Sequence, residues 1–184
     1  MRKIIVFEHV SIDGYIADKH GKIDWAIRDE ELTKFSQEGE ETVDMYLFGR
    51  ITYDMMASFW PTPMGKSVNP VFADILNKAN KIVFSRTLKE ATWENTEIVK
   101  HVDKEEIMKL KHKPGGNIMI FGSGILVSEL AKLGLIDDYQ LLVNPVVLGE
   151  GKPLFKNLPE MISLKLIRAK EFKSGVTFLH YQPK

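Results

Sequence analysis

Short apolar segments alternate with amphipathic segments along most of the chain. Nearly continuous apolar residues, as expected for strands that are covered on both faces of a sheet, occupy residues 3–10, 45–48, 81–84 and 118–121. A weaker strand pattern lies at residues 96–100. Helical spacing of apolar residues is found at residues 29–42, 51–59, 69–79, 103–111 and from about 125 to 133. This alternation predicts an α/β fold with a mostly parallel central sheet and helices on both faces.

Capping residues mark the ends of several predicted helices. Asn69 followed by Pro70 starts one helix and Asp103 starts another, because their side-chain oxygens can accept free N–H groups of the first turn. Pro61 and Pro63 are expected to end the helix at 51–59, since proline lacks the N–H group that a helix needs. Gly134 is a typical signal for the end of the helix that starts near residue 125.

The pattern changes to a period of two toward the C-terminus. Residues 138–148 are apolar and β-rich, and two alternating runs within residues 164–182 flank Lys173, Ser174 and Gly175. Alternation on both sides of a glycine-containing turn predicts a C-terminal antiparallel hairpin. Because no linker, repeat or low-complexity segment interrupts the chain, we expect residues 1–184 to form a single domain.

Composition and charge narrow the class of protein. The 184 residues include 25 Lys and Arg, 25 Asp and Glu, and no Cys. The lack of Cys excludes disulfides and thiolate metal sites, and the five His show no metal-ligand spacing. The zero net charge argues against a nucleic-acid binder, and no apolar run approaches the roughly 18 residues of a membrane helix. We expect a cytoplasmic protein without a metal, nucleic-acid partner or membrane partner.

Three predicted strands end in residues that suit an anionic ligand. In a parallel α/β sheet, ligands bind at the carboxyl ends of the strands. Helix N-termini offer free N–H groups to phosphates, and guanidinium groups form paired hydrogen bonds with them. The strand ends carry Gly49, Arg50 and Thr52, then Ser85 and Arg86, then Gly122, Ser123 and Gly124. The alternatives are a tight turn with Ser123 as a helix cap, ordinary surface arginines, and Thr52 as a cap.

Several motifs in this order resemble the dihydrofolate-reductase-like family. They are "VSIDGYIA", "LFGRITYDMM", "KIVFSRT" and "IMIFGSGILVSELAKLGLIDDYQLLVNPVVLGEGKPLF". The likeness covers essentially the whole chain and is greatest to the reductase (RibD C-terminal) domain of bacterial bifunctional riboflavin-biosynthesis proteins. It implies a three-layer fold and a homodimer. We expect no counterpart of the zinc deaminase domain of those bifunctional proteins, because these residues leave no room for one and include no Cys to bind the zinc.

The resemblance also implies NADPH as the cofactor. Gly49, Arg50 and Thr52 match the segment that meets the cofactor phosphates. Ser85 and Arg86 match the segment that recognises the adenosine 2′-phosphate. The residues from Gly122 through Ser123 to Gly124 match the turn at the pyrophosphate and nicotinamide, where a cis peptide between Gly122 and Ser123 is a hypothesis. Ser11 is expected to bind cofactor as well.

Catalytic carboxylates are less well defined by the sequence. Asp13 follows the first strand and is a candidate, although an Asp-Gly turn explains it equally well. Family carboxylates on the first helix match Asp29, Glu30 or Glu31, of which we select Glu30. Acidic residues at a helix start are also favoured by the helix dipole. A catalytic carboxylate of this group should be partly buried with a raised pKa.

Three further residues match the substrate region of the family. Trp25 stands where a tryptophan lies near the substrate, although core packing explains it as well. Asn144 and Glu150 bound a segment that resembles a substrate-closing loop in the riboflavin branch.

The sequence therefore predicts an NADPH-dependent reductase of a small heterocyclic substrate. The activity would resemble that of 5-amino-6-(5-phosphoribosylamino)uracil reductase or dihydrofolate reductase. One alternative is a catalytically silent NADP-binding dimer that acts as a sensor or scaffold. Another is a flavin-dependent protein.

Overall fold

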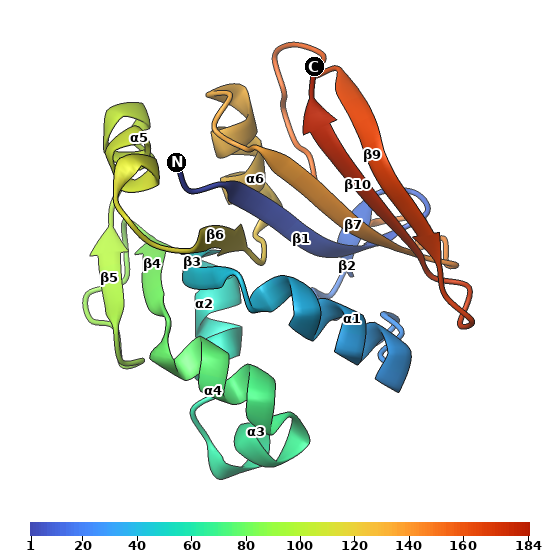
Figure 1. The fold of residues 1–184 in the computed structure, drawn as a ribbon, viewed down its shortest axis with the longest axis horizontal. Helices are drawn as coiled ribbons and strands as arrows, with labels where there is room; N and C mark the ends of the chain where they lie inside the picture. Colours follow the sequence, from blue (N-terminus) through green and yellow to red (C-terminus); the bar gives the residue numbers. More distant parts are fainter.

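The computed structural model describes residues 1–184 and is built on one eight-stranded sheet (Figure 1). In spatial order, the strands are β5 (Thr96–Val99), β4 (Asn80–Phe84), β3 (Val43–Gly49), β6 (Asn117–Ile120), β1 (Ile4–Ser11), β7 (Asp138–Asn144), β10 (Thr177–Pro183) and β9 (Leu164–Glu171). Strands β1 and β3 to β7 run parallel. Strand β10 is antiparallel to both β7 and β9. The predicted α/β fold with a mostly parallel sheet and a C-terminal hairpin is confirmed.

A small second sheet lies outside the predicted pattern. It pairs β2 (Tyr15–Asp18) with β8 (Gly151–Pro153) in antiparallel fashion. The N–H group of Leu154 also donates to the carbonyl of Gly14 at 3.0 Å. Strands of four and three residues are too short to show a period, so the sequence analysis missed both.

Six helices connect the strands. They are α1 (Glu30–Glu40), α2 (Arg50–Ala57), α3 (Pro63–Val68), α4 (Pro70–Lys78), α5 (Lys104–His112) and α6 (Gly124–Lys132). The side chains of Asn69 and Asp103 cap α4 and α5 as predicted. Helix α3 was not predicted, because Pro63 was interpreted only as a helix stop. Pro63 instead lies in the first turn of α3, where its missing N–H group has no intrahelical partner to lose, and Thr62 is the N-cap residue.

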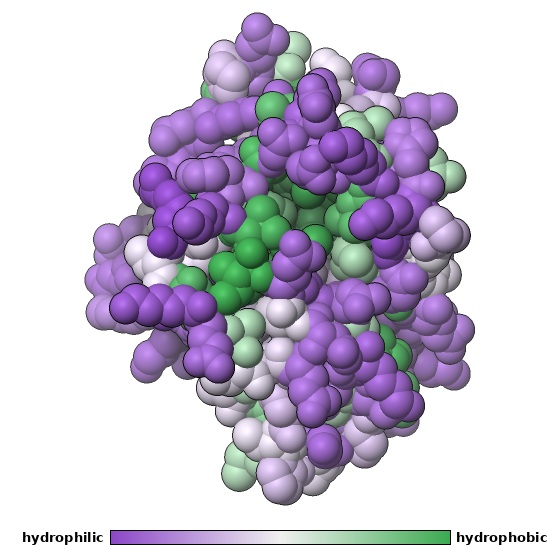
Figure 2. Space-filling model, turned by 90° about the vertical axis from the view of Figure 1, so that its left-hand side faces the viewer, coloured by the Kyte–Doolittle hydropathy of each residue, from purple (hydrophilic) through white to green (hydrophobic).

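Two apolar cores lie on opposite faces of the sheet, which gives three layers (Figure 1). Alternate residues of β1 point to different cores: Ile4 and Val6 face the core of α5 and α6, whereas Ile5 and Phe7 face the core of α1 and α4. No helix is long and apolar enough to cross a membrane. Seen from the β5 side, hydrophilic groups cover most of the surface and surround one hydrophobic hollow (Figure 2).

Strand register brings the carboxyl ends of neighbouring strands together. Gly49 of β3 is paired with Phe84 of β4, and Leu47 of β3 with Ile120 of β6. The chain therefore leaves β3, β4 and β6 at the same edge of the sheet.

Candidate functional site

The three predicted phosphate-binding junctions meet at this edge. The N–H group of Gly49 lies 3.5 Å from the carbonyl oxygen of Gly122, which accepts its hydrogen bond. From the same junction, Arg50 donates through Nη1 to Thr87 Oγ1 at 3.2 Å, next to Arg86. The convergence inferred from separate stretches of sequence is therefore present in the folded chain.

The peptide between Gly122 and Ser123 is cis, as hypothesised. Gly122 has a φ of 55°, in the region that favours glycine. Ser123 is the N-cap residue of α6, but its side chain makes no capping hydrogen bond. The free N–H groups of the first turn of α6 therefore have no side-chain acceptor from Ser123. A helix N-terminus that binds an anion needs such N–H groups to be free.

Glycine is needed in this region partly for contacts within the protein. A Cβ atom on Gly49 would lie 2.5 Å from Ser123 Oγ. A Cβ atom on Gly124 would overlap the carbonyl oxygen of Pro153 in β8. The sequence analysis explained these glycines by the approach of a ligand; the structure adds the close approach of neighbouring chain segments.

The residues predicted to bind phosphate differ in whether their side chains already have partners within the protein. Arg50 is bound to Asp54 at 2.7 Å, which orients its guanidinium. Arg86 is exposed and has no hydrogen-bond or ion-pair partner, so its guanidinium is available to an anion. The hydroxyl of Thr52 forms no intramolecular hydrogen bond, so the alternative that it caps a helix is not realised. Ser85 is buried, and its Oγ accepts the N–H groups that hold the turn after β4.

A cavity of about 540 Å³ opens beside these junctions, between the ends of β4 and β5 and helix α6. Its lining residues are Phe84, Ser85, Arg86, Lys100, His101, Val102, Ile125, Glu129, Lys132 and Leu133. Three of them are cations and only Glu129 is an anion, so the chemistry of the walls suits a phosphorylated ligand. The sequence analysis missed Lys100, because it assigned Lys100 to the strand pattern at 96–100, whereas β5 ends at Val99 and Lys100 follows it.

Ser11 and Asp13 together form a turn. Ser11 Oγ donates to Asp13 Oδ1 at 2.6 Å, and Asp13 accepts the N–H groups of Leu148 and Gly149 at 3.1 and 2.8 Å. The Ser11 hydroxyl is the main cause that lowers the pKa of Asp13; slight burial opposes it and the two N–H groups add to it. Asp13 is therefore ionised near neutral pH and holds the segment from 144 to 151 against the end of β1.

The acidic residues at the start of α1 are not buried together. Asp29 is the N-cap and accepts the N–H group of Leu32 at 2.8 Å. Glu30 is exposed and has no partner, whereas Glu31 lies 3.8 Å from Lys170. Glu30 thus lacks the partial burial that we expect of a catalytic carboxylate, and its position is the one that the helix dipole favours.

The predicted substrate residues occupy three different environments. Trp25 is half-buried and donates through Nε1 to the carbonyl of Lys22 at 3.2 Å. Glu150 is exposed and pairs with Lys19 at 2.7 Å. Asn144 is fully buried, accepts the N–H group of Ile27 at 2.9 Å and donates to the carbonyl of Leu142 at 2.9 Å. The Asn144 amide is therefore engaged within the protein and holds neighbouring segments together.

The sequence analysis did not select Glu8, the buried carboxyl at this edge. Its Oε1 atom is closed off from solvent and has no hydrogen-bond partner. Burial raises the pKa of Glu8 to about 8, although a hydrogen bond from the Gly122 backbone partly opposes the rise. The available signal was a Glu within a nearly continuous apolar run, which is uncommon for a residue pointing into a packed layer.

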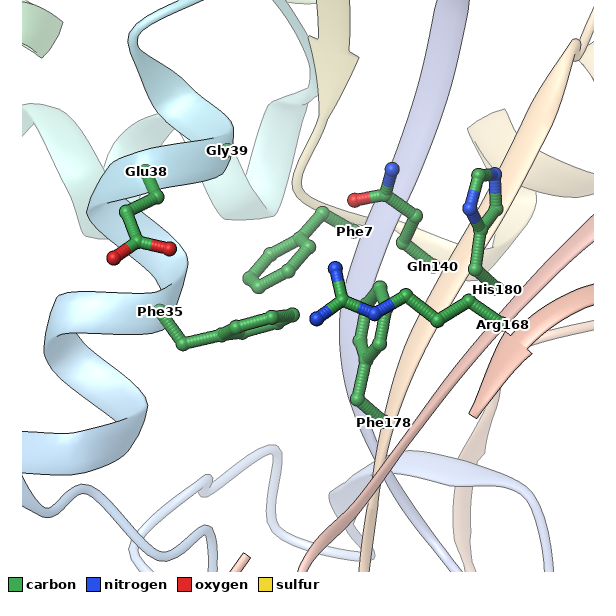
Figure 3. A pocket seen from close by; sticks show the side chains of 8 residues that line it. All are labelled: Phe7, Phe35, Glu38, Gly39, Gln140, Arg168, Phe178 and His180. Carbon is green, nitrogen blue, oxygen red and sulfur yellow. The ribbon is translucent and has the colours of Figure 1, made fainter. Parts of the chain in front are cut away.

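A second, smaller cavity of about 220 Å³ lies on the α1 side of the sheet (Figure 3). The rings of Phe7, Phe35 and Phe178 form its apolar walls, and Arg168 reaches across it to within 5.6 Å of the Phe35 ring centroid. The other lining residues are Glu38, Gly39, Gln140 and His180. None of them was a predicted site residue, because the cavity joins strands that are far apart in the sequence.

The fold and the converging junctions define the dihydrofolate-reductase-like class of α/β proteins, and comparison with known proteins agrees. A dihydrofolate reductase from Enterococcus faecalis complexed with NADP(H) has the same fold, with a TM-score of 0.66, 16% identity, and coverage of 99% of this chain and 96% of that one.

The chain belongs to the RibD C-terminal domain family, which matches residues 2–178. It is 35% identical over 186 residues to YyaP, an uncharacterized protein of Bacillus subtilis strain 168, covering 98% of this chain and 94% of the relative. The structure of a putative riboflavin biosynthesis protein from Shewanella sp. PV-4 is 29% identical, with a TM-score of 0.76 and 99% of both chains covered. The family resemblance inferred from the motifs is confirmed.

Proposed function

We propose that this protein is an NADPH-dependent reductase of a small heterocyclic substrate. The observation that carries the proposal is the meeting of three β-to-α junctions beside a cavity with cationic walls. The kinship with reductases of the same fold supports it. When bound, NADPH supplies a hydride to the substrate.

Different residues of the site would hold different parts of the cofactor. Gly49, Thr52 and the N-terminus of α6 are proposed to bind the pyrophosphate. The turn at Gly122, which matches the family turn at the pyrophosphate and nicotinamide, is proposed to meet the nicotinamide as well. Arg86 and Lys100 line the cavity at the ends of β4 and β5, and we assign them the adenosine 2′-phosphate. Arg50 is held between Asp54 and Thr87 and would orient the phosphates from the side of α2.

The substrate is proposed to bind near the end of β1. Three segments meet there: the turn at Asp13, the loop that contains Trp25, and the segment from Asn144 to Glu150. They are joined by the contacts of Asp13 with Gly149, of Asn144 with Ile27, and of Glu150 with Lys19.

The test is the affinity of wild type and Arg86→Ala for NADPH and NADH, measured by quenching of tryptophan fluorescence. Removing a charge-assisted hydrogen bond should weaken NADPH by about tenfold or more, whereas NADH, which lacks the 2′-phosphate, should bind nearly as before. Arg168→Ala, which removes an arginine of β9 in the other cavity, is the matched control. Equal weakening of both nucleotides would reject the 2′-phosphate role of Arg86, and a wild type that binds neither would reject the function.

A second candidate function is binding of NADP without turnover, in a homodimer that serves as a sensor or scaffold. It is favoured by one observation: Asp13 is ionised and Glu30 is exposed, so neither is placed as a proton donor. Oxidation of NADPH with any member of a panel of oxidised heterocycles would exclude it.

A further inference from the structure

We infer that Glu8 is the proton-holding residue of the proposed cofactor site: it is neutral in the free protein and releases its proton when oxidised, cationic cofactor binds at the Gly122 junction. This inference rests on the proposed function. It gives Glu8 a role that is separate from those of Asp13 and Glu30.

The geometry places the Glu8 carboxyl against a gap in the cofactor junction. A Cβ atom on Gly122 would lie 3.3 Å from Glu8 Oε1, 3.2 Å from Thr52 Oγ1 and 3.8 Å from Ile16 Cδ1. Because glycine has no Cβ, the carboxyl and the hydroxyl face the same small space. Glu8 Oε1 is closed off from solvent and has no hydrogen-bond partner in the protein. A buried carboxyl oxygen without a partner, at the junction proposed to receive the cofactor, indicates that a group from outside the chain completes the site.

No charged group within the protein compensates an ionised Glu8. Strand β7 places Leu141 opposite it, β2 contributes Ile16, and α2 contributes the uncharged Thr52. The charged residues of α2 nearest the junction are Arg50 and Asp54, which pair with each other.

The titratable neighbour on the same strand points elsewhere. His9 Nδ1 lies 3.2 Å from the amide nitrogen of Asn144, on the face opposite Glu8. Burial is the main cause that lowers the pKa of His9 to about 4; the charge of Arg28 lowers it further and the Asn144 contact opposes this. His9 is therefore uncharged near neutral pH and cannot stabilise an ionised Glu8.

These surroundings give Glu8 a defined response to a positive charge. Burial without a cationic partner keeps the carboxyl neutral, with its pKa raised to about 8. A cation beside a buried carboxyl lowers that pKa. NADP⁺ carries a positive nicotinamide ring and NADPH does not, whereas the two share the same phosphates. Binding of NADP⁺ should therefore be coupled to loss of the Glu8 proton, and binding of NADPH should not.

The decisive experiment is isothermal titration calorimetry of NADP⁺ and NADPH at neutral pH, in two buffers that differ in ionisation enthalpy. For the wild type we expect release of close to one more proton with NADP⁺ than with NADPH. Because both nucleotides carry the same 2′-phosphate, the difference isolates the nicotinamide end. From pH 6 to 8, the affinity for NADP⁺ should rise by up to about tenfold per pH unit relative to the affinity for NADPH.

Glu8→Gln should abolish this difference and retain binding of NADPH, which also reports that the variant is folded. Glu40→Gln removes a different buried carboxyl and is the matched control, with proton release like that of the wild type. Equal proton release with both nucleotides in the wild type, or an unchanged difference in Glu8→Gln, would overturn the inference. The wild-type comparison is decisive even if Glu8→Gln does not fold. A wild type that binds neither nucleotide would instead reject the proposed function, and with it the cofactor as the partner of Glu8.

Discussion

Glu8 and Glu40 are two buried carboxyls of the same chemistry in different parts of the molecule. Burial raises the pKa of each to about 8, and each has one oxygen without a hydrogen-bond partner. Glu8 lies at the carboxyl edge of the sheet, in the gap beside Gly122 and Thr52. Glu40 lies at the end of α1, where its charge acts on Tyr46 in the core.

The comparison shows that a perturbed pKa alone does not identify a functional residue. Around Glu40, the other group without a partner is the Tyr46 hydroxyl, which is enclosed in the α1-side core. Around Glu8, the other groups belong to junctions that converge on a cation-lined cavity. We therefore expect Glu40 to affect stability alone, and Glu8 to affect both stability and cofactor binding.

The largest effect on stability is expected for Glu40→Gln. The pKa of Glu40 rises from 4.5 to about 8 on folding, so its stabilising contribution is complete below pH 4.5 and is lost as pH rises toward 8. The wild type should lose up to about 1.4 kcal/mol of unfolding free energy per pH unit over this range through Glu40. Glu40→Gln removes this loss, so it should be more stable than the wild type at pH 8 and similar at pH 4.5. Urea unfolding at several pH values measures the difference.

Glu38→Gln is the control for this prediction. Glu38 is exposed and lies on the same helix, so its removal should leave the pH dependence as in the wild type. If Glu40→Gln and the wild type lost stability in parallel as pH rises, Glu40 would not be the titrating group.

An effect of the same sign is expected for Glu8→Gln without cofactor. Burial raises the pKa of Glu8 to about 8 even with the opposing Gly122 hydrogen bond, so the pH-dependent loss through Glu8 should be comparable to that through Glu40. Saturating NADP⁺ should reduce this loss in the wild type and leave the loss through Glu40 unchanged. Thermal unfolding with and without NADP⁺, at pH 6 and pH 8, compares the two carboxyls directly. An equal response to NADP⁺ in Glu8→Gln and in the wild type would remove the distinction between them.

The smallest effect is expected for Tyr46→Phe. The buried hydroxyl has no partner, and burial, followed by the charge of Glu40, raises the pKa of Tyr46. Removing the hydroxyl should change the unfolding free energy by about 1 kcal/mol or less, toward higher stability. A loss of several kcal/mol in urea unfolding would reveal a hydrogen bond that holds this core together.

Local sequence patterns predicted most of the fold because the elements carry their own signals. The apolar run at residues 3–10 became β1, and the caps Asn69 and Asp103 start helices where expected. Helix α3 and strands β2 and β8 were missed because each is too short for a period to emerge. Their positions depend on contacts from distant residues, such as that of Leu154 with Gly14.

The sequence by itself determined the order of strands and helices, the motifs of the family and the junction residues from Gly49 to Gly124, because each of these depends on neighbours along the chain. Only the tertiary structure decided that Glu8 faces Gly122, that Asn144 is enclosed, and that Lys100 joins Arg86 in one cavity. The physical reason is that burial, and with it the ionisation of a carboxyl, is set by the segments that surround a residue. In this protein those segments come from strands and helices far apart in the sequence.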